Sequence, residues 1–268
     1  MTNPFKADVL VVKLSGKALT ADKALDALFA ALAGSAANAE RTRVVLAHGG
    51  GVEVDALMRG LDRPIDRIEG LRVSPDEDMP VIAGALAGTC SLKLRGAAQR
   101  AGLMPLGLCA TDAGIGRVVP ADPRLGRVGV IEPGDSAAKR RLQALLDAGF
   151  TPVISSVGMD AAGALWNINA DDAAVASAAL LGAPLIFLSD VPGVLDANKH
   201  LFEQLNEKQA ETLIAEGVIS GGMTVKVRAA FRAAAMTGKP VAAASVFDPM
   251  LPNKLASGQL PGTTFTLE

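Results

Sequence analysis

The sequence predicts an α/β fold in which a mainly parallel sheet is covered by helices on both faces. Short apolar runs typical of strands alternate along the chain with Ala- and Leu-rich segments of helical length, and short connections join them. With 268 residues, half of them hydrophobic, the chain can bury the core of one large domain or of two closely joined lobes.

The expected elements follow from this alternation. The strand-type runs are residues 9–14, 44–47, 151–156 and 184–189. Helices are expected from about residue 20, at 52–61, from about 75 to 101, from 136 onward, at 207–215 and at 224–237. The Gly-, Pro- and Asp-rich stretch 107–133 predicts a hairpin or flap, and residues 260–268 predict a closing strand. If two lobes exist, they share one sheet and divide near residue 180.

Composition excludes several classes of function. The net charge is −2 and no long basic run occurs, so we expect no nucleic-acid partner. Aromatic residues make up 3% of the chain and Tyr is absent, which argues against stacking surfaces for bases or sugars. Neither a signal peptide nor an apolar run of about 18 residues is recognisable, so we expect a cytoplasmic protein without membrane contact. Cys90 and Cys109 lack the spacing of a zinc or redox motif, so we expect them to be buried thiols.

The first candidate site follows the first strand, in VVKLSGKAL. Lys13, Ser15 and Gly16 stand at the carboxyl end of a parallel strand, where open sheets usually bind ligands. A solvated lysine at a strand end is the alternative interpretation. The turn matches neither of the common glycine-rich phosphate motifs.

The second candidate is HGGGVEVDAL, in which a strand meets three glycines and a helix start. Without Cβ atoms, Gly50 and Gly51 let the backbone approach an anion, toward which the first N–H groups of the helix point. We expect an anion cradle here rather than a purely structural turn. His48 is expected to orient the loop by hydrogen bonding, because two isolated histidines give little support to His-based catalysis.

Two further segments carry groups suited to a carboxylate or amide. Arg72 in EGLRVS is suited to bidentate capture of a carboxylate, although this segment alone slightly favours an exposed strand arginine. In LWNINADDAA, Asn167 and Asn169 alternate on an extended segment and Asp171 begins a helix. Helix capping explains one of these three residues and leaves the others for function.

The last two candidates lie in the carboxyl-terminal third. SGGMTVKVRAA repeats the pattern of a glycine pair at a helix start, with Lys226 about one turn into the helix. Two such helix starts and two lysines would form a positive cage in which Asp171 keeps the ammonium groups apart, as phosphoryl transfer requires. LSDVPGVLD ends a buried strand in an Asp- and Gly-containing turn, which either supports a nucleotide or is simply structural.

Taken together, these motifs closely resemble the amino acid kinase family, and within it the branch that serves arginine biosynthesis. VVKLSG, HGGGVEVDALMRGL, GLRVSPDEDM, GALAGT, NINADDAA, LSDVPGVLD and GGMTVKV occur in the order expected for that branch and span nearly the whole chain. The resemblance implies a three-layer αβα sandwich. It also implies that residues 1–180 form a lobe for the acyl substrate and for dimerisation, and that residues 181–268 form a lobe for ATP.

The resemblance also implies roles for individual residues. Lys13 and Lys226 would stabilise the transferring phosphoryl group, with Asp171 organising them. The remaining implied contacts are N–H groups from Gly16, Gly50 and Gly51, substrate contacts from Arg72 and Asn167, and ATP contacts from Ser189, Asp190, Gly221, Gly222 and Met223. The implied substrates are N-acetyl-L-glutamate and ATP, with Mg²⁺ carried by the phosphates rather than by a protein metal site.

Three points remain open in the sequence. Ser15 stands where the acetylglutamate branch commonly has glycine, as in the turn of uridylate kinases. This departure keeps uridylate as an alternative substrate. Acylated aminoadipate as the substrate, or a non-catalytic sensor of nucleotide or amino acid, are further alternatives. Only about eight residues precede the first strand, and from this we expect a homodimer without feedback by arginine, because arginine-inhibited members carry an additional amino-terminal helix that links dimers into hexamers.

Overall fold

The structure, a computed structural model, describes residues 8–35, 42–257, 259 and 261–267. Residues 1–7, on which the expectation about the amino terminus depends, and residues 260 and 268 of the expected closing strand lie outside this part. Among the described residues, no helix combines the length and the apolar character needed to cross a membrane.

An eight-stranded sheet forms the centre of the molecule, in the order β12-β14-β13-β11-β1-β2-β8-β5. Neighbours from β13 to β5 are parallel, and β14 runs antiparallel to β13. The strands are β1 Val9–Leu14, β2 Arg43–His48, β5 Pro105–Cys109, β8 Thr151–Ser155, β11 Leu185–Ser189, β12 Gln204–Asn206, β13 Val241–Ser245 and β14 Thr263–Thr266. The predicted α/β fold with a mainly parallel sheet is confirmed. The structure adds β5, β12 and β13, which the sequence pattern did not reveal.

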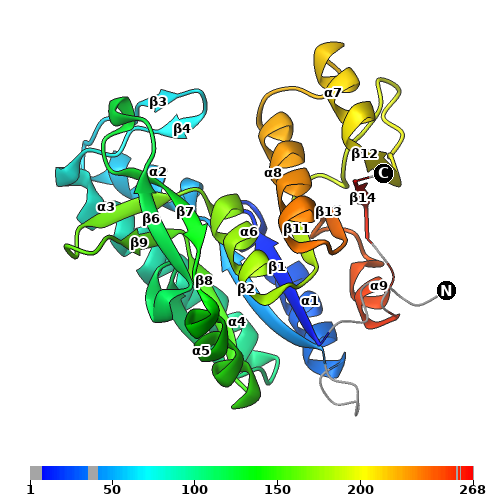
Figure 1. The fold of residues 1–268 in the computed structure, drawn as a ribbon, viewed down its shortest axis with the longest axis horizontal. Helices are drawn as coiled ribbons and strands as arrows, with labels where there is room; N and C mark the ends of the chain where they lie inside the picture. Colours follow the sequence, from blue (N-terminus) through cyan, green and yellow to red (C-terminus); the bar gives the residue numbers. More distant parts are fainter. Residues whose placement is uncertain (1–7, 36–41, 258, 260, 268) are drawn as a thin grey trace.

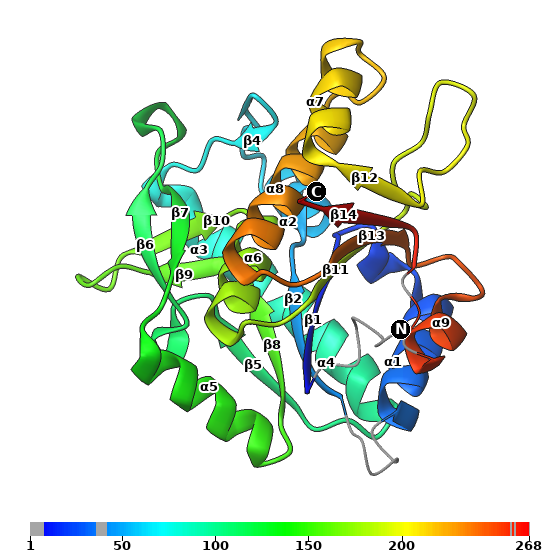
Figure 2. The same cartoon turned by 45° about the vertical axis from the view of Figure 1, so that its right-hand side comes forward.

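Helices cover both faces of this sheet, as Figures 1 and 2 show. The helices are α1 Asp22–Ser35, α2 Gly51–Gly60, α3 Met79–Ala83, α4 Ser91–Arg100, α5 Ser136–Asp147, α6 Ala170–Leu181, α7 Glu207–Ala215, α8 Gly222–Thr237 and α9 Leu251–Ser257. Short 3₁₀ turns occupy Ala18–Thr20, Asp76–Asp78, Asp112–Gly114 and Pro123–Leu125. The expected helices are therefore present, with starts shifted by up to a few residues.

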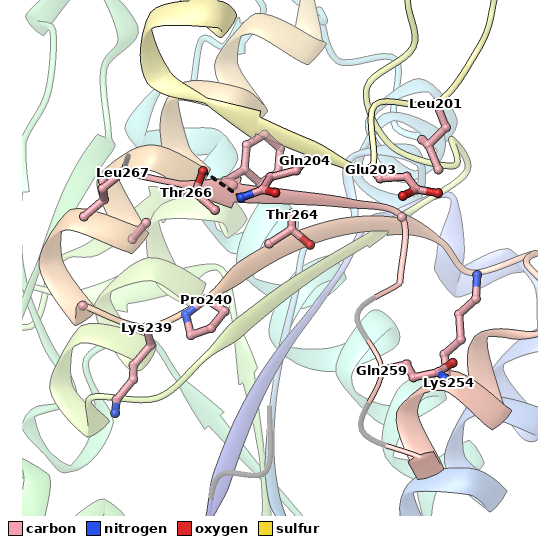
Figure 3. Close-up of a pocket in the computed structure, with 14 residues that line it drawn as sticks. Leu201, Glu203, Gln204, Lys239, Pro240, Lys254, Gln259, Thr264, Thr266 and Leu267 are labelled. Carbon is pink, nitrogen blue, oxygen red and sulfur yellow. Dashed lines mark hydrogen bonds between the residues drawn. The ribbon is translucent and has the colours of Figure 1, made fainter. Parts of the chain in front are cut away.

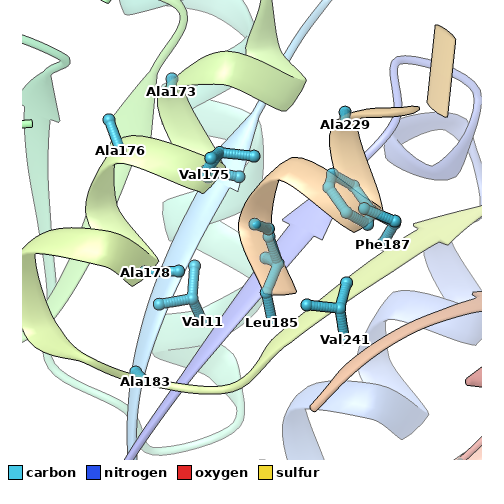
Figure 4. Packing of buried hydrophobic residues seen from close by; sticks show 14 of the residues in the cluster. Val11, Ala173, Val175, Ala176, Ala178, Ala183, Leu185, Phe187, Ala229 and Val241 are labelled. Carbon is cyan, nitrogen blue, oxygen red and sulfur yellow. The ribbon is translucent and has the colours of Figure 1, made fainter. Parts of the chain in front are cut away.

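The alternation of side chains along β1 divides the core into two layers. Val9 and Val11 join the buried cluster under α5, α6 and α8, whereas Leu10, Val12 and Leu14 join the cluster under α1, α4 and α9. Successive side chains of a strand point to opposite faces, so a strand buried on both faces reads as a continuous apolar run. Figure 4 shows the first cluster, in which small alanines of α6 bring this helix close to β1 and β11.

The long helix predicted from about Pro75 to Ala101 is present but not uniform. A 3₁₀ turn precedes α3, and a π-helical stretch, Gly84–Cys90, connects α3 to α4. Pro80 lies in the first turn of α3, where proline costs no hydrogen bond. π-helical turns are rare and are often found at functional sites. Here the stretch presents Leu86 and Cys90 to the glycine loop after β2.

Two smaller sheets flank one end of the central sheet. The first has the order β6-β7-β10-β9, with β6 Gly116–Pro120, β7 Val128–Pro133, β9 Val157–Met159 and β10 Leu165–Ile168. β6 and β7 are antiparallel, which confirms the hairpin expected between residues 107 and 133. The second is a hairpin of β3 Arg67–Ile68 and β4 Leu71–Arg72.

Candidate active site

The carboxyl ends of β1, β2 and β11 bring three turns together. Leu14 aligns with His48 on β2 and with Leu188 on β11, so the turns that follow these strands begin at the same level. A Cβ atom on Gly16 would lie 3.3 Å from the backbone nitrogen of Gly51. The first two sequence candidates are therefore in contact, at the edge where open parallel sheets bind their ligands.

Lys13 and Asp171 form a buried ion pair at this edge. The Lys13 Nζ lies 2.5 Å from the Asp171 Oδ1, and the two side chains are 9% and 11% exposed. Lys13 projects from β1 toward α6, whose amino-terminal cap is Asn169, with its Oδ1 accepting from the backbone N–H of Asp171. Desolvation largely cancels the attraction in a buried pair, so such a pair is weak evidence for a stabilising role. Its position instead favours a role in arranging charge.

The neighbouring carboxylate points elsewhere. Asp172 forms an ion pair with Arg232 on α8, and burial raises the pKa of Asp172 against the opposing effect of Arg232. Consecutive residues of a helix project about 100° apart, so only Asp171 faces the sheet edge. The pair Asp172–Arg232 links α6 to α8, which pack against each other.

Lys226 completes the group of charges predicted from sequence. It lies one turn into α8, is half-buried, and forms no ion pair in the described part of the chain. Burial lowers its pKa, and so does the positive charge of Lys13, whereas Asp171 and Asp190 oppose the shift. Lys226 is thus within electrostatic range of both members of the buried pair. The structure brings Lys13, Asp171 and Lys226 together, and their catalytic roles stay predictions.

The expected ATP residues lie beside this group. Ser189 ends β11 and is buried, and Asp190 follows it on the surface. Gly221 caps α8 with a φ of 56°, a conformation that favours glycine, and Gly222 and Met223 open the helix. The sequence analysis missed a partner here. The Lys17 Nζ lies 2.8 Å from the Asp190 Oδ2, which joins the turn after β1 to the turn after β11 and lowers the pKa of Asp190.

Gly50 is fixed by close packing. A Cβ atom there would lie 2.4 Å from the Cys90 Sγ and 3.0 Å from the Leu86 Cδ2, both on the π-helical stretch. A Cβ atom on Gly51 would meet nothing within 4 Å. Gly50 is therefore required by close packing, whereas Gly51 leaves open space at the start of α2.

Gly50→Ala is expected to lower the free energy of unfolding by about 1–3 kcal/mol, the usual cost of overpacking. Gly51→Ala is the matched control and should leave the free energy of unfolding unchanged, since its Cβ meets no atom. Denaturant unfolding of both variants measures the difference. Adding Cys90→Ala to Gly50→Ala should recover part of the loss, and equal stability of the two single variants would contradict this account of the loop.

His48 is fully buried beneath the glycine loop. Its Nδ1 lies 3.0 Å from the carbonyl oxygen of Gly49 and donates to it, in agreement with the orienting role expected from sequence. Burial lowers the pKa of His48 to about 4, and Arg95 also lowers it, against the opposing effect of the Gly49 carbonyl. The imidazole is therefore neutral at pH 7 and supplies no charge to the site.

His48 should make stability depend on pH. The unfolded chain binds a proton here below about pH 6.5, and the folded protein does so only near pH 4. The stability contributed by neutral His48 is therefore complete above pH 6.5 and is lost as the pH falls toward 4, by about 2 kcal/mol at pH 5. Unfolding free energies between pH 7.5 and pH 5 measure this. His48→Gln should flatten the slope, His200→Gln at the exposed histidine should not, and identical slopes in all three proteins would refute the assignment.

Two successive hydrogen bonds connect Asn167 to Arg72 through Ser74. The Asn167 Nδ2 donates to the Ser74 Oγ at 3.0 Å, and the Ser74 hydroxyl donates to the Arg72 carbonyl oxygen at 3.2 Å. Arg72 is only 7% exposed, which excludes the exposed strand arginine considered above. Its Nη2 donates to the Gly51 carbonyl oxygen at 3.3 Å and to the carboxylate of Asp55. The sequence analysis missed Ser74 and Asp55, although Asp55 stands one helical turn after Gly51.

A cavity of about 1130 Å³ lies away from these residues. It is bordered by β12, β14 and the carboxyl end of α8, with Glu203, Lys239 and Lys254 among its lining (Figure 3). No predicted site residue lines it. Within the described ranges, no group of three or more His, Cys, Asp or Glu side chains could hold a metal ion.

The geometry just described agrees with the comparisons to known proteins. The profile of the Amino acid kinase family matches residues 8–244. The chain belongs to this family. The resemblance stated from the motifs is thereby confirmed.

Among its relatives, the acetylglutamate kinase of Vibrio vulnificus is 47% identical over 265 residues, covering 99% of this chain and 99% of the relative. The acetylglutamate kinase of Aeromonas salmonicida is 46% identical, covering 96% and 98%.

Solved structures support the same fold. The protein smu.665 of Streptococcus mutans superposes with a TM-score of 0.82 at 27% identity, covering 97% of this chain and 99% of that one. An N-acetylglutamate synthase of Neisseria gonorrhoeae, complexed with coenzyme A and N-acetyl-glutamate, superposes with a TM-score of 0.81 at 23% identity, covering 97% and 59%. At that identity the second likeness shows the fold alone.

Proposed function

We propose that this chain is an ATP-dependent kinase that phosphorylates the γ-carboxylate of N-acetyl-L-glutamate and releases ADP, the second step of arginine biosynthesis. The observation that carries the proposal is the convergence of Lys13, Asp171 and Lys226 beside two glycine-lined helix starts. Such a cluster suits a polyphosphate, because ammonium groups and backbone N–H groups compensate the charge of phosphoryl oxygens. The named acetylglutamate kinases among its relatives favour the acylated amino acid as acceptor.

The reaction needs no general base. The γ-carboxylate of the acceptor is ionised near pH 7, so one of its oxygens can attack the γ-phosphorus of MgATP directly. The new bond forms between that oxygen and phosphorus, and the bond from phosphorus to the β–γ bridging oxygen breaks, leaving ADP. Catalysis then depends on alignment and on charge compensation by Lys13 and Lys226. A neutral His48 is consistent with this scheme.

The acceptor is expected at the side of the site formed by Arg72 and Asn167. Arg72 would bind the α-carboxylate, and Asn167 the acetamido end. Residues 1–180 would then form the acceptor lobe and residues 181–268 the ATP lobe, with Mg²⁺ held by the phosphates and water. The strand order supports this division, because β5, β8, β2 and β1 lie on one side of the β1–β11 junction and the later strands on the other.

We also propose a homodimer. β5 is the last strand of the central sheet, and its outer edge pairs with no other strand in the described ranges. Leu92 and Met104, near this edge in sequence, are 60% and 57% exposed. An open strand edge beside exposed apolar side chains is typical of a surface of association. Light scattering should give the mass of two chains, and the mass of one chain would contradict the proposal.

A panel of acceptors tests the function directly. Purified protein with MgATP should release ADP with N-acetyl-L-glutamate, and far more slowly with L-glutamate, aspartate or UMP. Turnover with UMP alone would show that the protein is a uridylate kinase. Turnover with an acylated aminoadipate alone would keep the mechanism and change the substrate. ATP binding without turnover of any acceptor would favour the sensor.

A further inference from the structure

The hairpin that carries Arg72 has an unusual pair of charges. Arg67 on β3 and Arg72 on β4 are directly opposite each other in the antiparallel register. Like charges in such positions are destabilising. Here both guanidinium groups contact one carboxylate, that of Asp55 on α2.

The carboxylate of Asp55 accepts hydrogen bonds from both arginines. The Arg67 Nη2 donates to both of its oxygens, to Oδ2 at 2.9 Å and to Oδ1 at 3.1 Å, and Oδ1 also accepts from the Arg72 Nη2. Burial opposes ionisation of Asp55, but the hydrogen bond and charge of Arg72, together with those of Arg67, lower its pKa overall. Asp55 is therefore an anion at neutral pH. Two guanidinium groups and one carboxylate leave the cluster with one net positive charge.

The guanidinium of Arg72 is held on one side and free on the other. Its Nη2 is occupied by Asp55 and by the Gly51 carbonyl oxygen, so the guanidinium is fixed to the start of α2. Its Nη1 is buried and has no hydrogen-bond partner in the described part of the chain. A buried N–H group that stays unpaired is costly, and more so on a charged group. This free nitrogen therefore indicates an anionic ligand.

We infer that Asp55 is a positioning residue for substrate recognition, which orients Arg72 so that its Nη1 meets the carboxylate of the acceptor. This inference rests on the proposed function. Asp55 does not contact the substrate. Asp55 balances the charge of one arginine, and Arg67 gives the cluster its net positive charge, which attracts an incoming carboxylate, so Arg67, Asp55 and Arg72 act as one unit.

The test compares steady-state kinetics of the full chain and its variants, with N-acetyl-L-glutamate and MgATP varied separately. Asp55→Asn should raise the KM for the acceptor about 10-fold or more, the loss expected for a charge-assisted hydrogen bond. The KM for MgATP should stay within about two-fold. Asp62→Asn, an exposed site just after α2 with the same change of charge, is the control and should behave as the wild type.

A double variant distinguishes a positioning role of Asp55 from a general loss of stability. In Asp55→Asn, Arg72 loses its anchor and is repelled by Arg67. Adding Arg67→Gln removes the repulsion and should lower the acceptor KM again. An unchanged acceptor KM in Asp55→Asn would overturn the inference, and so would a parallel loss for both substrates with no recovery in the double variant.

The same experiment distinguishes a failure of the proposed function from a failure of the inference about Asp55. If the wild type phosphorylates a different carboxylic acid, the proposed substrate is wrong, and the KM for that acid then decides the role of Asp55. If the wild type phosphorylates UMP and no carboxylic acid, both the function and the inference are overturned.

Discussion

Lys226→Ala is expected to lower kcat by about two to three orders of magnitude, the loss typical of removing one donor that stabilises charge in a transition state. Lys226 is half-buried on α8, within electrostatic range of Lys13 and Asp171, and forms no ion pair among the described residues. Its removal therefore leaves no buried partner unpaired, and the fold should persist. Lys13→Ala is less informative, because it would leave Asp171 buried without its counter-ion.

The KM for MgATP should change far less than kcat in this variant, because the second lysine acts mainly on the charge that develops during transfer. Arg228→Ala, two residues further along α8 in an exposed ion pair with Glu211, is the matched control and should retain activity. Steady-state kinetics with saturating acceptor measure both parameters. Equal losses in kcat and in ATP affinity would contradict a catalytic role and favour simple nucleotide binding.

Arg72→Ala is expected to raise the KM for N-acetyl-L-glutamate by about 10- to 100-fold, the range for losing a hydrogen bond between charged groups. The physical reason is the buried Nη1, which has no partner among the described residues and which the α-carboxylate would satisfy. The KM for MgATP should stay near its original value, since Arg72 is proposed to bind the acceptor and not the nucleotide.

Two variants sharpen this result. Arg72→Lys keeps the charge but loses the planar fork, so it should fall between the wild type and Arg72→Ala. Arg59→Ala, an exposed arginine at the end of α2, should leave the acceptor KM unchanged. If Arg72→Ala shows unchanged kinetics for the acceptor, the assignment of an acylated amino acid as substrate fails.

The sequence predicted those features that depend on local order along the chain. Lys13 lies near the end of an apolar strand and Gly50 precedes a helix, and strand ends of a parallel sheet meet at one edge whatever the details of packing. The same reasoning placed Asp171 and Lys226 at helix starts. The structure then supplied the ion pair between Lys13 and Asp171 and the position of Lys226 beside it.

The missed features depend on distant contacts or on weak local signals. Lys17 and Asp190 are 173 positions apart, and nothing near either residue predicts their ion pair. The contact of Asp55 with both arginines requires the β3–β4 hairpin to fold over α2. β5, with the sequence PLGLC, and β13, with VAAAS, escaped recognition because Pro, Gly and Ala are poor strand formers. These two segments form strands because they pack against and pair with neighbouring strands of the sheet.

The most direct test of the proposed reaction is to trap its product with hydroxylamine. An acyl phosphate reacts with hydroxylamine to give a hydroxamate, whereas a phosphate ester does not. With MgATP and N-acetyl-L-glutamate, we predict hydroxamate in amounts equal to the ADP released, and none when the acceptor is omitted. ADP release without hydroxamate would show that phosphate is not transferred to a carboxylate, and would contradict the function proposed for Lys13, Asp171 and Lys226.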